Sequence, residues 1–203
     1  ITVKANSGSK TYDGTKLTVD GFETLSFTVN GQTYTVEGLT AHAEGTNVSD
    51  SKAVTVTGTP VVKDTAGNDV TAQFTVTTKN GTLTINPVAI ELTAASDSKP
   101  YDGTALTNNG YTITSGKFVG EEGLASVTVE GSQTLVGSSN NAITGYALKD
   151  NTAASDYTIT TRLGTLTVTD RDDGEKYVIT VKANSGSKTY DGTKLTVDGF
   201  ETL

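Results

Sequence analysis

Apolar and polar residues alternate with a period of two along most of the chain. Residues 25–29 alternate in this way, Asn30 and Gly31 follow, and the alternation resumes over residues 32–36. An Asn-Gly pair between two alternating runs is a strong signal for a β-hairpin, because a type I′ turn needs two residues with positive φ. No segment carries the apolar stripe of an amphipathic helix, so the pattern predicts an all-β protein.

The same pattern predicts several other strands. Alternation indicates strands at 53–57 and at 125–129. A turn at 79–81 is expected to close a further hairpin, whose last strand covers residues 82–85. Short strands separated by turn residues are typical of sandwiches and barrels.

The sequence also repeats itself. Residues 1–25 recur without change at 179–203, and a diverged copy at 90–114 matches them at 12 of 25 positions. The segments 74–85 and 157–168 align with each other as well. Self-similarity at a fixed period is typical of an array of like domains. An unchanged copy indicates recent duplication, which suits an array of adjustable length better than an active site.

The repeat predicts three segments. We expect a first β repeat domain at 1–88, a second at 89–178 that includes an acidic connector at 169–178, and the opening strands of a third at 179–203. Roughly six or seven strands fall in each complete unit, which favours tandem small β-domains, each an immunoglobulin-like sandwich, in an elongated arrangement. A β-grasp-like fold is the alternative, although neither unit shows the helix of that fold.

The last segment is too short to bury a core by itself. We expect residues 179–203 to dock as strands, either on the preceding domain or, by exchange, on a neighbouring molecule. A second frame stays open, in which domains start near residue 26. In that frame residues 179–203 complete the second unit and residues 1–25 are the extra piece.

Composition predicts small cores beneath a hydroxyl-rich surface. Hydrophobic residues make up 34% of the 203 positions, whereas 40 positions are Thr. Thr is β-branched, which disfavours helices and suits a half-exposed strand. The chain has no Cys, which excludes disulfides and thiolate metal sites, and no apolar run is long enough to span a membrane. An internal piece of a longer secreted protein is expected to look like this.

Charge narrows the choice of partners. The formal net charge is −8, and residues 89–178 hold 6 basic and 12 acidic groups, against 6 and 8 in residues 1–88. An acidic surface without a basic patch argues against nucleic acid and anionic membranes as partners. We interpret the charges as keeping a secreted protein soluble.

A short motif, Lys-Xaa-Tyr-Asp-Gly-Thr, lies near the start of each copy and begins at Lys10, Lys99 and Lys188. Each complete unit also ends on a similar Thr-rich element with the letters Gly-Thr-Leu-Thr. Both features resemble YDG and MBG-type domains, over the whole of both units. The resemblance implies a tandem module of a large bacterial adhesin that is secreted or held at the cell surface, in a parent protein anchored to the cell wall. It implies no catalytic residues.

The motif also has a structural interpretation. Asp-Gly pairs form turns because Gly adopts positive φ and Asp accepts hydrogen bonds from nearby amides. The Tyr ring is expected to pack over the edge of the core with a partner for its hydroxyl, and the Lys two residues before it shares its strand face. The alternative is a carbohydrate contact made by the Tyr, Asp and Lys side chains. The candidate residues are Lys10, Tyr12, Asp13, Gly14, Lys99, Tyr101, Asp102 and Gly103.

Enzymatic activity is not expected. Nucleophilic and general-base mechanisms usually rely on Cys, His or paired carboxylates in a pocket. His42 is the one histidine; it lies in a polar stretch and has no counterpart in the second unit. We interpret it as an exposed residue of a loop or strand.

The acidic connector suggests a calcium site that would stiffen the joint after the second unit. Its spacing departs from that of an EF-hand loop, so a solvated linker is the alternative. The candidate ligands are Asp170, Asp172, Asp173 and Glu175.

A third hypothesis is an intramolecular Lys–Asn isopeptide crosslink, as in many Cys-free pilin and adhesin domains. It needs a Lys, an Asn or Asp, and an acid buried together, since an unpaired buried Lys is costly. The residues that recur in both units are Lys10 and Lys99, Lys63 and Lys149, and Asp64 and Asp150.

Two functions from different classes follow. As a stalk, the array projects an N-terminal binding head from the cell wall, and two units in line span roughly 70–80 Å. As a binding surface, each unit weakly holds a host glycan or mucin, and multiplicity supplies avidity. Binding predicts an exposed aromatic platform, whereas 8 Tyr, 5 Phe and no Trp are mostly needed for the cores. Aromatic content therefore favours the stalk.

Overall fold

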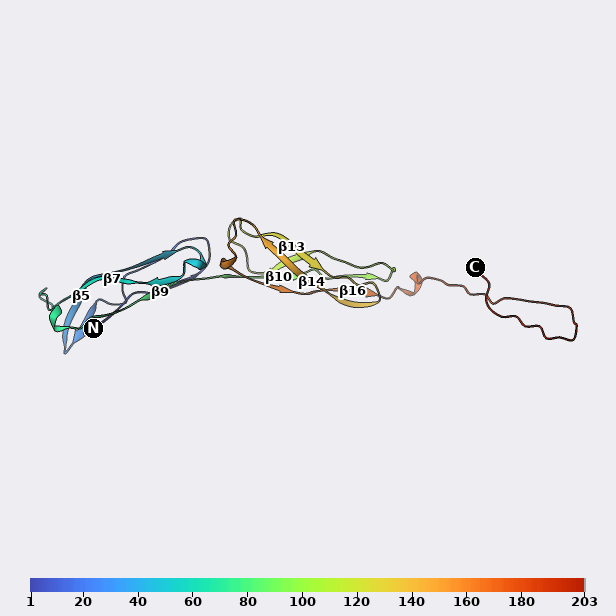
Figure 1. Ribbon diagram of the computed structural model, residues 1–203, viewed down its shortest axis with the longest axis horizontal. Helices are drawn as coiled ribbons and strands as arrows, with labels where there is room; N and C mark the ends of the chain where they lie inside the picture. The colour runs from blue at the N-terminus through green and yellow to red at the C-terminus, as the bar shows by residue number, and fades with distance from the viewer. Residues whose placement is uncertain (203) are drawn as a thin grey trace.

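Strands dominate the chain, as the period-two pattern predicts. The computed structural model describes residues 1–202, and in this range the helical segments are four 3-10 turns of three residues each. The prediction of an all-β protein is therefore confirmed. The strands form two groups that follow each other along one long axis (Figure 1).

The first strand group covers residues 2–86. Its burial alternates as expected: in β9 the apolar Leu83 and Ile85 are buried, whereas Thr82 faces solvent. The elements are β1 Thr2–Lys4, β2 Gly8–Thr11, β3 Leu17–Asp20, β4 Ser26–Val29, β5 Gln32–Gly45, η1 Val48–Asp50, β6 Lys52–Val54, β7 Val56–Lys63, η2 Thr71–Gln73, β8 Thr77–Lys79 and β9 Gly81–Asn86.

The second strand group covers residues 88–169. Strand β10 begins two residues after β9 ends, so the chain passes directly from one group into the next (Figure 1). The elements are β10 Val88–Ala94, β11 Asp97–Pro100, β12 Tyr111–Ser115, β13 Leu124–Glu130, β14 Gly137–Leu148, η3 Ala154–Asp156, β15 Tyr157–Arg162 and β16 Gly164–Thr169.

The first and last strands of each group run parallel to each other. In the first group β1 pairs with β8 and β2 with β9; in the second, β10 pairs with β15 and β11 with β16. The other pairs are antiparallel: β3, β4 and β7 on β5, β6 on β9, β12 on β10, and β14 on both β13 and β16. Both groups therefore share the parallel pairing of their ends.

Each parallel pair changes sheets part-way along. Between β1 and β2, and between β8 and β9, the two chains leave one sheet and enter another side by side. A Cβ on Gly81 would lie 1.9 Å from the carbonyl oxygen of Asn6, and one on Gly164 would lie 2.2 Å from that of Ala95. Only glycine allows the two main chains to approach this closely at the crossing.

The two hairpin predictions have opposite outcomes. β4 and β5 form the predicted hairpin, with φ of 50° at Asn30 and 78° at Gly31. The closing hairpin at 79–81 is wrong, because β8 and β9 pair with β1 and β2 and not with each other. The predicted strand at 53–57 is interrupted at Thr55, since β6 and β7 belong to different sheets. The strand at 125–129 is confirmed within β13.

The largest apolar core runs from one strand group into the other. It contains Leu83 and Ile85 of β9 together with Ile90 and Leu92 of β10, and all four are at most 2% exposed. Two smaller cores lie toward the outer ends; their buried members are Val3, Val36 and Val62 in the first group and Leu106, Leu166 and Val168 in the second.

Residues 170–202 extend away from the second group (Figure 1). This tail contains η4 Asp173–Glu175 and an isolated bridge between Ala183 and Phe200. Every strand pairing described lies within 2–86 or within 88–169. The expectation that residues 179–203 dock as strands on the preceding unit is therefore wrong for the described residues 179–202.

Candidate functional site: the Tyr-Asp-Gly turn and the junction it joins

The first Lys-Xaa-Tyr-Asp-Gly-Thr motif folds into a turn held by its own side chains. Oδ1 of Asp13 accepts hydrogen bonds from the main-chain N and Oγ1 of Thr15, at 2.8 and 2.7 Å. Nζ of Lys10 lies 2.5 Å from the same oxygen, and Gly14 has a φ of 77°. The hydrogen bond from Lys10, helped by those from Thr15, lowers the pKa of Asp13 to about 2.

The same turn forms in the other two copies. Asp102 accepts hydrogen bonds from Thr104 and Lys99, and Lys99 also lowers the pKa of the Asp102 carboxyl well below its usual range. In the tail, Asp191 accepts hydrogen bonds from Lys188 and from Thr193. Because the turn forms even where no sheet supports it, its stability is local.

Tyr12 carries the first turn into contact with the second strand group. Its ring is 6% exposed, and its Oη donates a 2.6 Å hydrogen bond to Oε1 of Glu122. Next to it, a Cβ on Gly14 would lie 3.0 Å from the side chain of Val119. The turn therefore joins the two groups as well as ending the β2–β9 pair.

Glu122 holds two tyrosines at once. Oη of Tyr157, the first residue of β15, donates to Oε2 of Glu122 and accepts a 2.9 Å hydrogen bond from the main-chain N of Val119. The Glu122 hydrogen bond, followed by burial, raises the pKa of Tyr12 far above its usual range. Burial, followed by Glu122, raises the pKa of Tyr157 to about 12. Both phenols are therefore held in the neutral, donating form.

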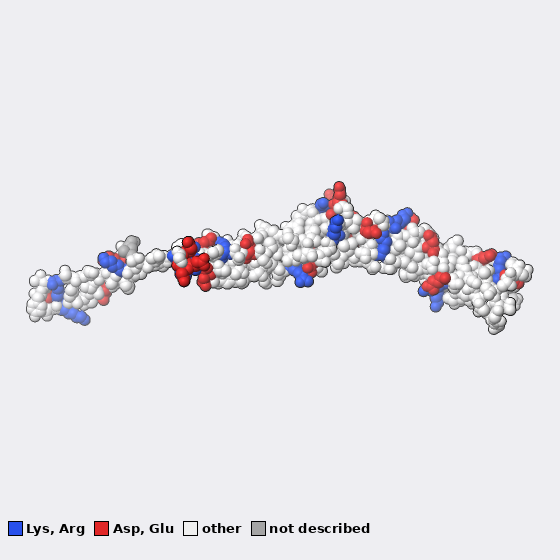
Figure 2. Space-filling view, turned by 180° about the vertical axis from the view of Figure 1, so that it is seen from behind, with Lys and Arg blue, Asp and Glu red and all other residues white. Residues whose placement is uncertain are grey.

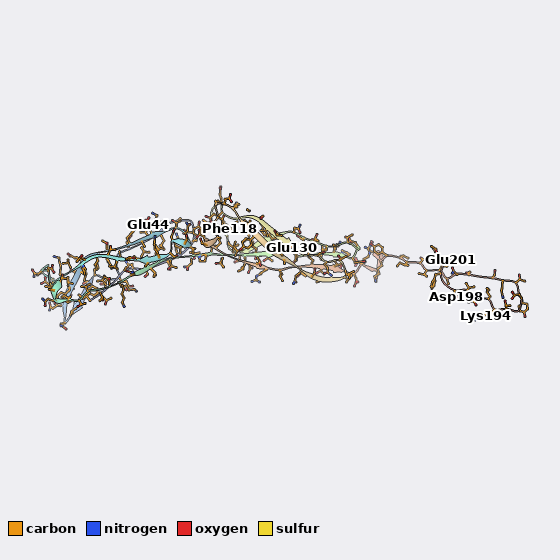
Figure 3. All side chains as sticks on the ribbon, viewed as in Figure 1. Glu44, Phe118, Glu130, Lys194, Asp198 and Glu201 are labelled. Atoms are coloured by element: carbon orange, nitrogen blue, oxygen red, sulfur yellow. The ribbon has the colours of Figure 1, made fainter. Side chains whose placement is uncertain are left out.

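Aromatic rings fill the space behind these hydroxyls. The rings of Tyr12 and Tyr157 meet edge to face with centroids 5.8 Å apart, and Phe118 lies 4.8 Å from Tyr157. Figure 3 places Phe118 where the two groups meet, beside the end of the first group that bears Glu44. Edge-to-face rings stabilise a contact beyond the area they bury.

A buried carboxylate makes a second bond across the junction. Asp156, in η3, is 1% exposed, and its Oδ1 accepts a 2.7 Å hydrogen bond from the main-chain N of Val48, the first residue of η1. A buried carboxylate needs such donors, because burial without them is costly. We name the set Tyr12, Val48, Phe118, Val119, Glu122, Asp156 and Tyr157 the junction.

The tyrosines aligned with Tyr12 lie in different surroundings. Tyr101 is partly buried, and its carbonyl oxygen accepts a 3.0 Å hydrogen bond from Arg171, whose guanidinium lies 4.4 Å from the centre of the Tyr177 ring. Tyr190 in the tail is 92% exposed. Tyr12 has both features expected of the motif tyrosine: its ring packs against the core, and its hydroxyl has a hydrogen-bond partner.

Sequence reasoning missed the partners of Tyr12. One signal was present: Tyr157 aligns with Phe74 of the first unit, so the two closing elements differ by a hydroxyl. Phe74 packs against Tyr34 at the outer end of the first group, whereas the Tyr157 hydroxyl is used at the junction. No pattern in the sequence marked Glu122 or Asp156, because their partners in the first group are more than 100 residues away.

The other candidate residues are not brought together into a site. Nδ1 of His42 lies 2.5 Å from Oδ1 of Asp20, on an exposed face of β5. In the connector, Asp173 pairs with Lys176 and Glu175 lies 3.8 Å from Arg171. Figure 2 shows a group of acidic side chains on the surface where the second group ends. Among residues 1–202, no three His, Asp or Glu side chains converge as metal ligands would.

The lysines proposed for an isopeptide crosslink make other contacts. Lys63 and Lys149 donate to the carbonyl oxygens of Gly67 and Glu121, at 3.4 and 3.0 Å, and Lys10 bonds within its own turn. The buried polar residues of the described chain are Asn141, Thr152 and Asp156, and the hydrogen bonds of their side chains involve no lysine. The geometry of an isopeptide site is therefore not formed by these lysines.

A shallow groove lined with hydroxyl groups recurs at aligned positions of the two groups. Each groove lies over the last parallel strand pair, β2–β9 in the first group and β11–β16 in the second. The lining residues are Ser7, Gly8, Ser9, Thr82, Thr84 and Asn86 in one, and Ser96, Asp97, Ser98, Thr165 and Thr167 in the other.

Comparisons with known proteins found no relative. No family model, no curated protein and no solved structure matches the chain. Within residues 1–202, no helix has the length and apolar character that a membrane span requires.

Proposed function

We propose that the chain is a non-enzymatic repeat module of a bacterial surface adhesin, acting as an extended stalk that projects a binding region from the cell wall. The observation that carries the proposal is the junction. Tyr12 and Val48 of the first group are hydrogen-bonded to Glu122 and Asp156 of the second, and one apolar core passes between them. A joint with this many fixed contacts transmits orientation from one group to the next.

Tandem immunoglobulin-like domains are part of the same proposal. Its support is the recurrence, in both groups, of parallel pairing between first and last strands and of the Lys-Tyr-Asp-Gly-Thr turn beside it. The helical segments of the described residues are all short 3-10 turns, so these residues lack the helix of a β-grasp fold, and this disfavours that alternative. A surface location agrees with the Cys-free, Thr-rich composition and with the absence of a basic patch.

The stalk is tested by measuring how rigidly the two groups are held. The chain has no Cys, so two cysteines placed at the exposed positions Gln32 and Ala105 accept spin labels at sites of choice. We expect a narrow distribution of distances between the labels. Glu122→Ala should broaden it, and Glu130→Ala, on the exposed side of β13, should leave it unchanged. A broad distribution in the unmodified chain would refute a stalk built on this joint.

The second candidate function is weak, multivalent binding of host glycans or mucin. The observation that favours it is the hydroxyl-lined groove, which occurs at aligned positions in both groups and offers donors and acceptors to a sugar. Neither groove is lined by an aromatic residue, which disfavours strong stacking on a sugar ring. A screen against mucins and glycans separates the two functions: saturable binding that multivalent display strengthens supports the grooves, and silence in both formats leaves the stalk.

A further inference from the structure

Strand β12 forms an open edge in the middle of the second strand group. Its sheet runs in the order β12-β10-β15, so within residues 1–202 β12 has one neighbouring strand, and all its residues are exposed. It carries no charged residue and no proline, whereas the other edge strands of the group, β11, β13 and β15, carry Pro100, Glu130 and Arg162. Charged residues and proline protect sheet edges against pairing with a further strand. The β12 edge lacks this protection.

The aligned edge of the first group is charged. Residues 22–26 correspond to 111–115, and Glu23 of this segment lies 2.5 Å from Nζ of Lys4. Thr112 and Thr93 stand at the two aligned positions of the second group and face each other across β12 and β10. The uncharged edge is therefore a property of the second group and not of the repeat as a whole.

The main-chain groups of Tyr111 and Ile113 point toward the open edge. The main-chain N of Ala95 donates a 2.9 Å hydrogen bond to the carbonyl oxygen of Gly110, just before β12. Hydrogen-bonded pairs recur at every second residue of an antiparallel ladder, so Thr112 is the next residue that bonds to β10. The N–H and C=O groups of Tyr111 and Ile113, on either side of Thr112, are therefore directed away from β10.

The side chains of the same two residues extend the apolar face of the sheet. Tyr111 lies opposite Ala94 and Ile113 opposite Leu92, and residues opposite each other share a face. Ala94 and Leu92 are buried, whereas Tyr111 is 39% exposed and Ile113 44%. Thr112 lies on the other face. A further strand beside β12 would therefore satisfy main-chain groups and cover apolar surface at once.

We propose that β12 is a self-association site, where it pairs antiparallel with β12 of a second copy of this chain. The open main-chain groups set the register. Tyr111 of each copy pairs with Ile113 of the other, and each of these pairs exchanges both of its main-chain hydrogen bonds. Thr112 then lies opposite itself on the two-fold axis. This inference does not depend on the stalk proposal.

The side chains of β12 complement those of a second copy. In this register each Tyr111 packs beside an Ile113, and aromatic residues next to β-branched ones stabilise antiparallel pairs. The two Thr112 hydroxyls meet on the other face. The chain already joins strands through threonines in this way, since Oγ1 of Thr40 on β5 lies 2.8 Å from Oγ1 of Thr57 on β7. A second copy therefore supplies a matching partner for every one of these residues.

Charge also allows two copies to meet at this edge. Each chain has a formal net charge of −8, so a contact between copies has to avoid like charges. The β12 strands are uncharged, and antiparallel pairing brings the end of one strand beside the start of the other. Lys117 follows one end of β12, and Asn108, which donates a 3.1 Å hydrogen bond to Asp97, precedes the other. The charges that flank the pair therefore have opposite signs.

The proposed interface is small. Stable protein–protein interfaces bury about 1,200 Å² or more in total, and two strands of five residues each bury less. We therefore expect the dimer to have a Kd on the order of 1 mM, and the chain to be a monomer in dilute solution.

A single cysteine tests the register, because the chain has no other. Thr112 lies opposite itself in a pair that is not hydrogen-bonded, where the two Cα atoms are about 4.5 Å apart and a disulfide can form. Thr112→Cys should give disulfide-linked dimers on mild oxidation, with twice the mass of the 21.0 kDa chain. Thr114→Cys, on the same exposed strand, is the matched control. Its two copies would be more than ~10 Å apart in this register, so it should stay monomeric.

Two charged variants test the contact without a covalent bond. In sedimentation equilibrium at about 0.1–1 mM, the molar mass of the unmodified chain should rise with concentration. Thr112→Lys and Thr112→Glu each place like charges opposite each other, so neither should show this rise alone. Mixed, they should associate, because opposite charges then face each other. Thr112 is exposed, so both variants are expected to fold.

Three results would overturn the proposal. Equal crosslinking of Thr112→Cys and Thr114→Cys would show that β12 does not pair in this register. Association of Thr112→Lys alone, as strong as that of the unmodified chain, would place the contact elsewhere on the surface. An unmodified chain that stays monomeric throughout this concentration range, together with charged variants that do not associate when mixed, would show that the edge does not bind a second copy.

Discussion

Asn141 supplies in the second strand group the amide that Asn6 supplies in the first. Nδ2 of Asn6 donates to the carbonyl of Asp20 at 2.7 Å, and Nδ2 of Asn141 donates to the carbonyls of Asn108 and Ala95 at 2.7 and 2.9 Å. Both amides fix the turn that precedes the glycine aligned in the two copies. They reach it from different strands, because Asn6 precedes β2 whereas Asn141 lies in β14.

This relationship predicts that the two positions compensate. In the aligned sequences, Asn6 of the first unit corresponds to Ala95 of the second. Asn141 occupies the place that Val54 has in the first group, because Asn141 pairs with Gly164 and Val54 pairs with the aligned Gly81. Asn141→Val should lower the free energy of unfolding by about 1–3 kcal/mol, since it leaves two carbonyl groups without their donor. Adding Ala95→Asn should recover most of the loss. Chemical denaturation of the single and double variants checks this, and a double variant less stable than Asn141→Val would refute it.

The junction predicts a specific role for the Tyr12 hydroxyl. Tyr12→Phe removes one of the two phenols that donate to Glu122. The loss of a hydrogen bond to a charged group is expected to lower the free energy that couples the two strand groups by about 1.5–3 kcal/mol. The two strand groups should then unfold in separate transitions in a calorimetric scan. Tyr101→Phe, at the aligned position outside the junction, is the matched control and should leave the scan unchanged.

Alkaline pH should open the junction. Tyr12 and Tyr157 have pKa values raised above the usual 10, that of Tyr157 to about 12. A phenol whose pKa is raised by folding contributes stability that is fully present below pH 10 and is lost as the pH rises through its folded pKa. Absorbance of the phenolate should show these two tyrosines ionising above pH 10, with Tyr157 near pH 12. Loss of inter-group order before Tyr157 ionises would contradict this.

The crossing glycines should tolerate no side chain. Gly81→Ala and Gly164→Ala each place a methyl group within 2.2 Å of a main-chain oxygen, so we expect losses of about 1–3 kcal/mol or more. Gly145→Ala in β14 is the control, because nothing lies within 4 Å of its Cβ position. Thermal unfolding measures the three variants. If Gly81→Ala left the thermal stability unchanged, β2 and β9 would have to move apart at little cost in free energy.

Local features of this fold could be predicted from the sequence, and non-local ones could not. The Asn30-Gly31 hairpin follows from two adjacent positive φ values, and the Asp13 turn closes within six residues. The Asn80-Gly81 pair looks similar in the sequence but serves another purpose. Asn80 accepts a hydrogen bond from Val56 N, and Gly81 allows close contact with Asn6, so parallel pairing overrides the hairpin signal.

The candidate site also has a local part that could be predicted from the sequence and a non-local part that could not. The turn residues of the motif were identified because all their bonds are local. The junction depends on Glu122 and Asp156, whose partners Tyr12 and Val48 are 110 and 108 residues away, and nothing in a single sequence connects them. The repeat itself could be recognised because identical letters need no structural knowledge.

The parallel pairing of first and last strands has a mechanical consequence. The chain enters the first group at Thr2, the start of β1, and leaves it at Asn86, at the far end of β9, which is paired with β2. A pulling force along the chain therefore draws two parallel strands past each other lengthwise. Hydrogen bonds that run across the strands then share the load and must break together, whereas a hairpin pulled at its open end loses them one at a time. The second group has the same connection, so each would resist tension as a shear clamp.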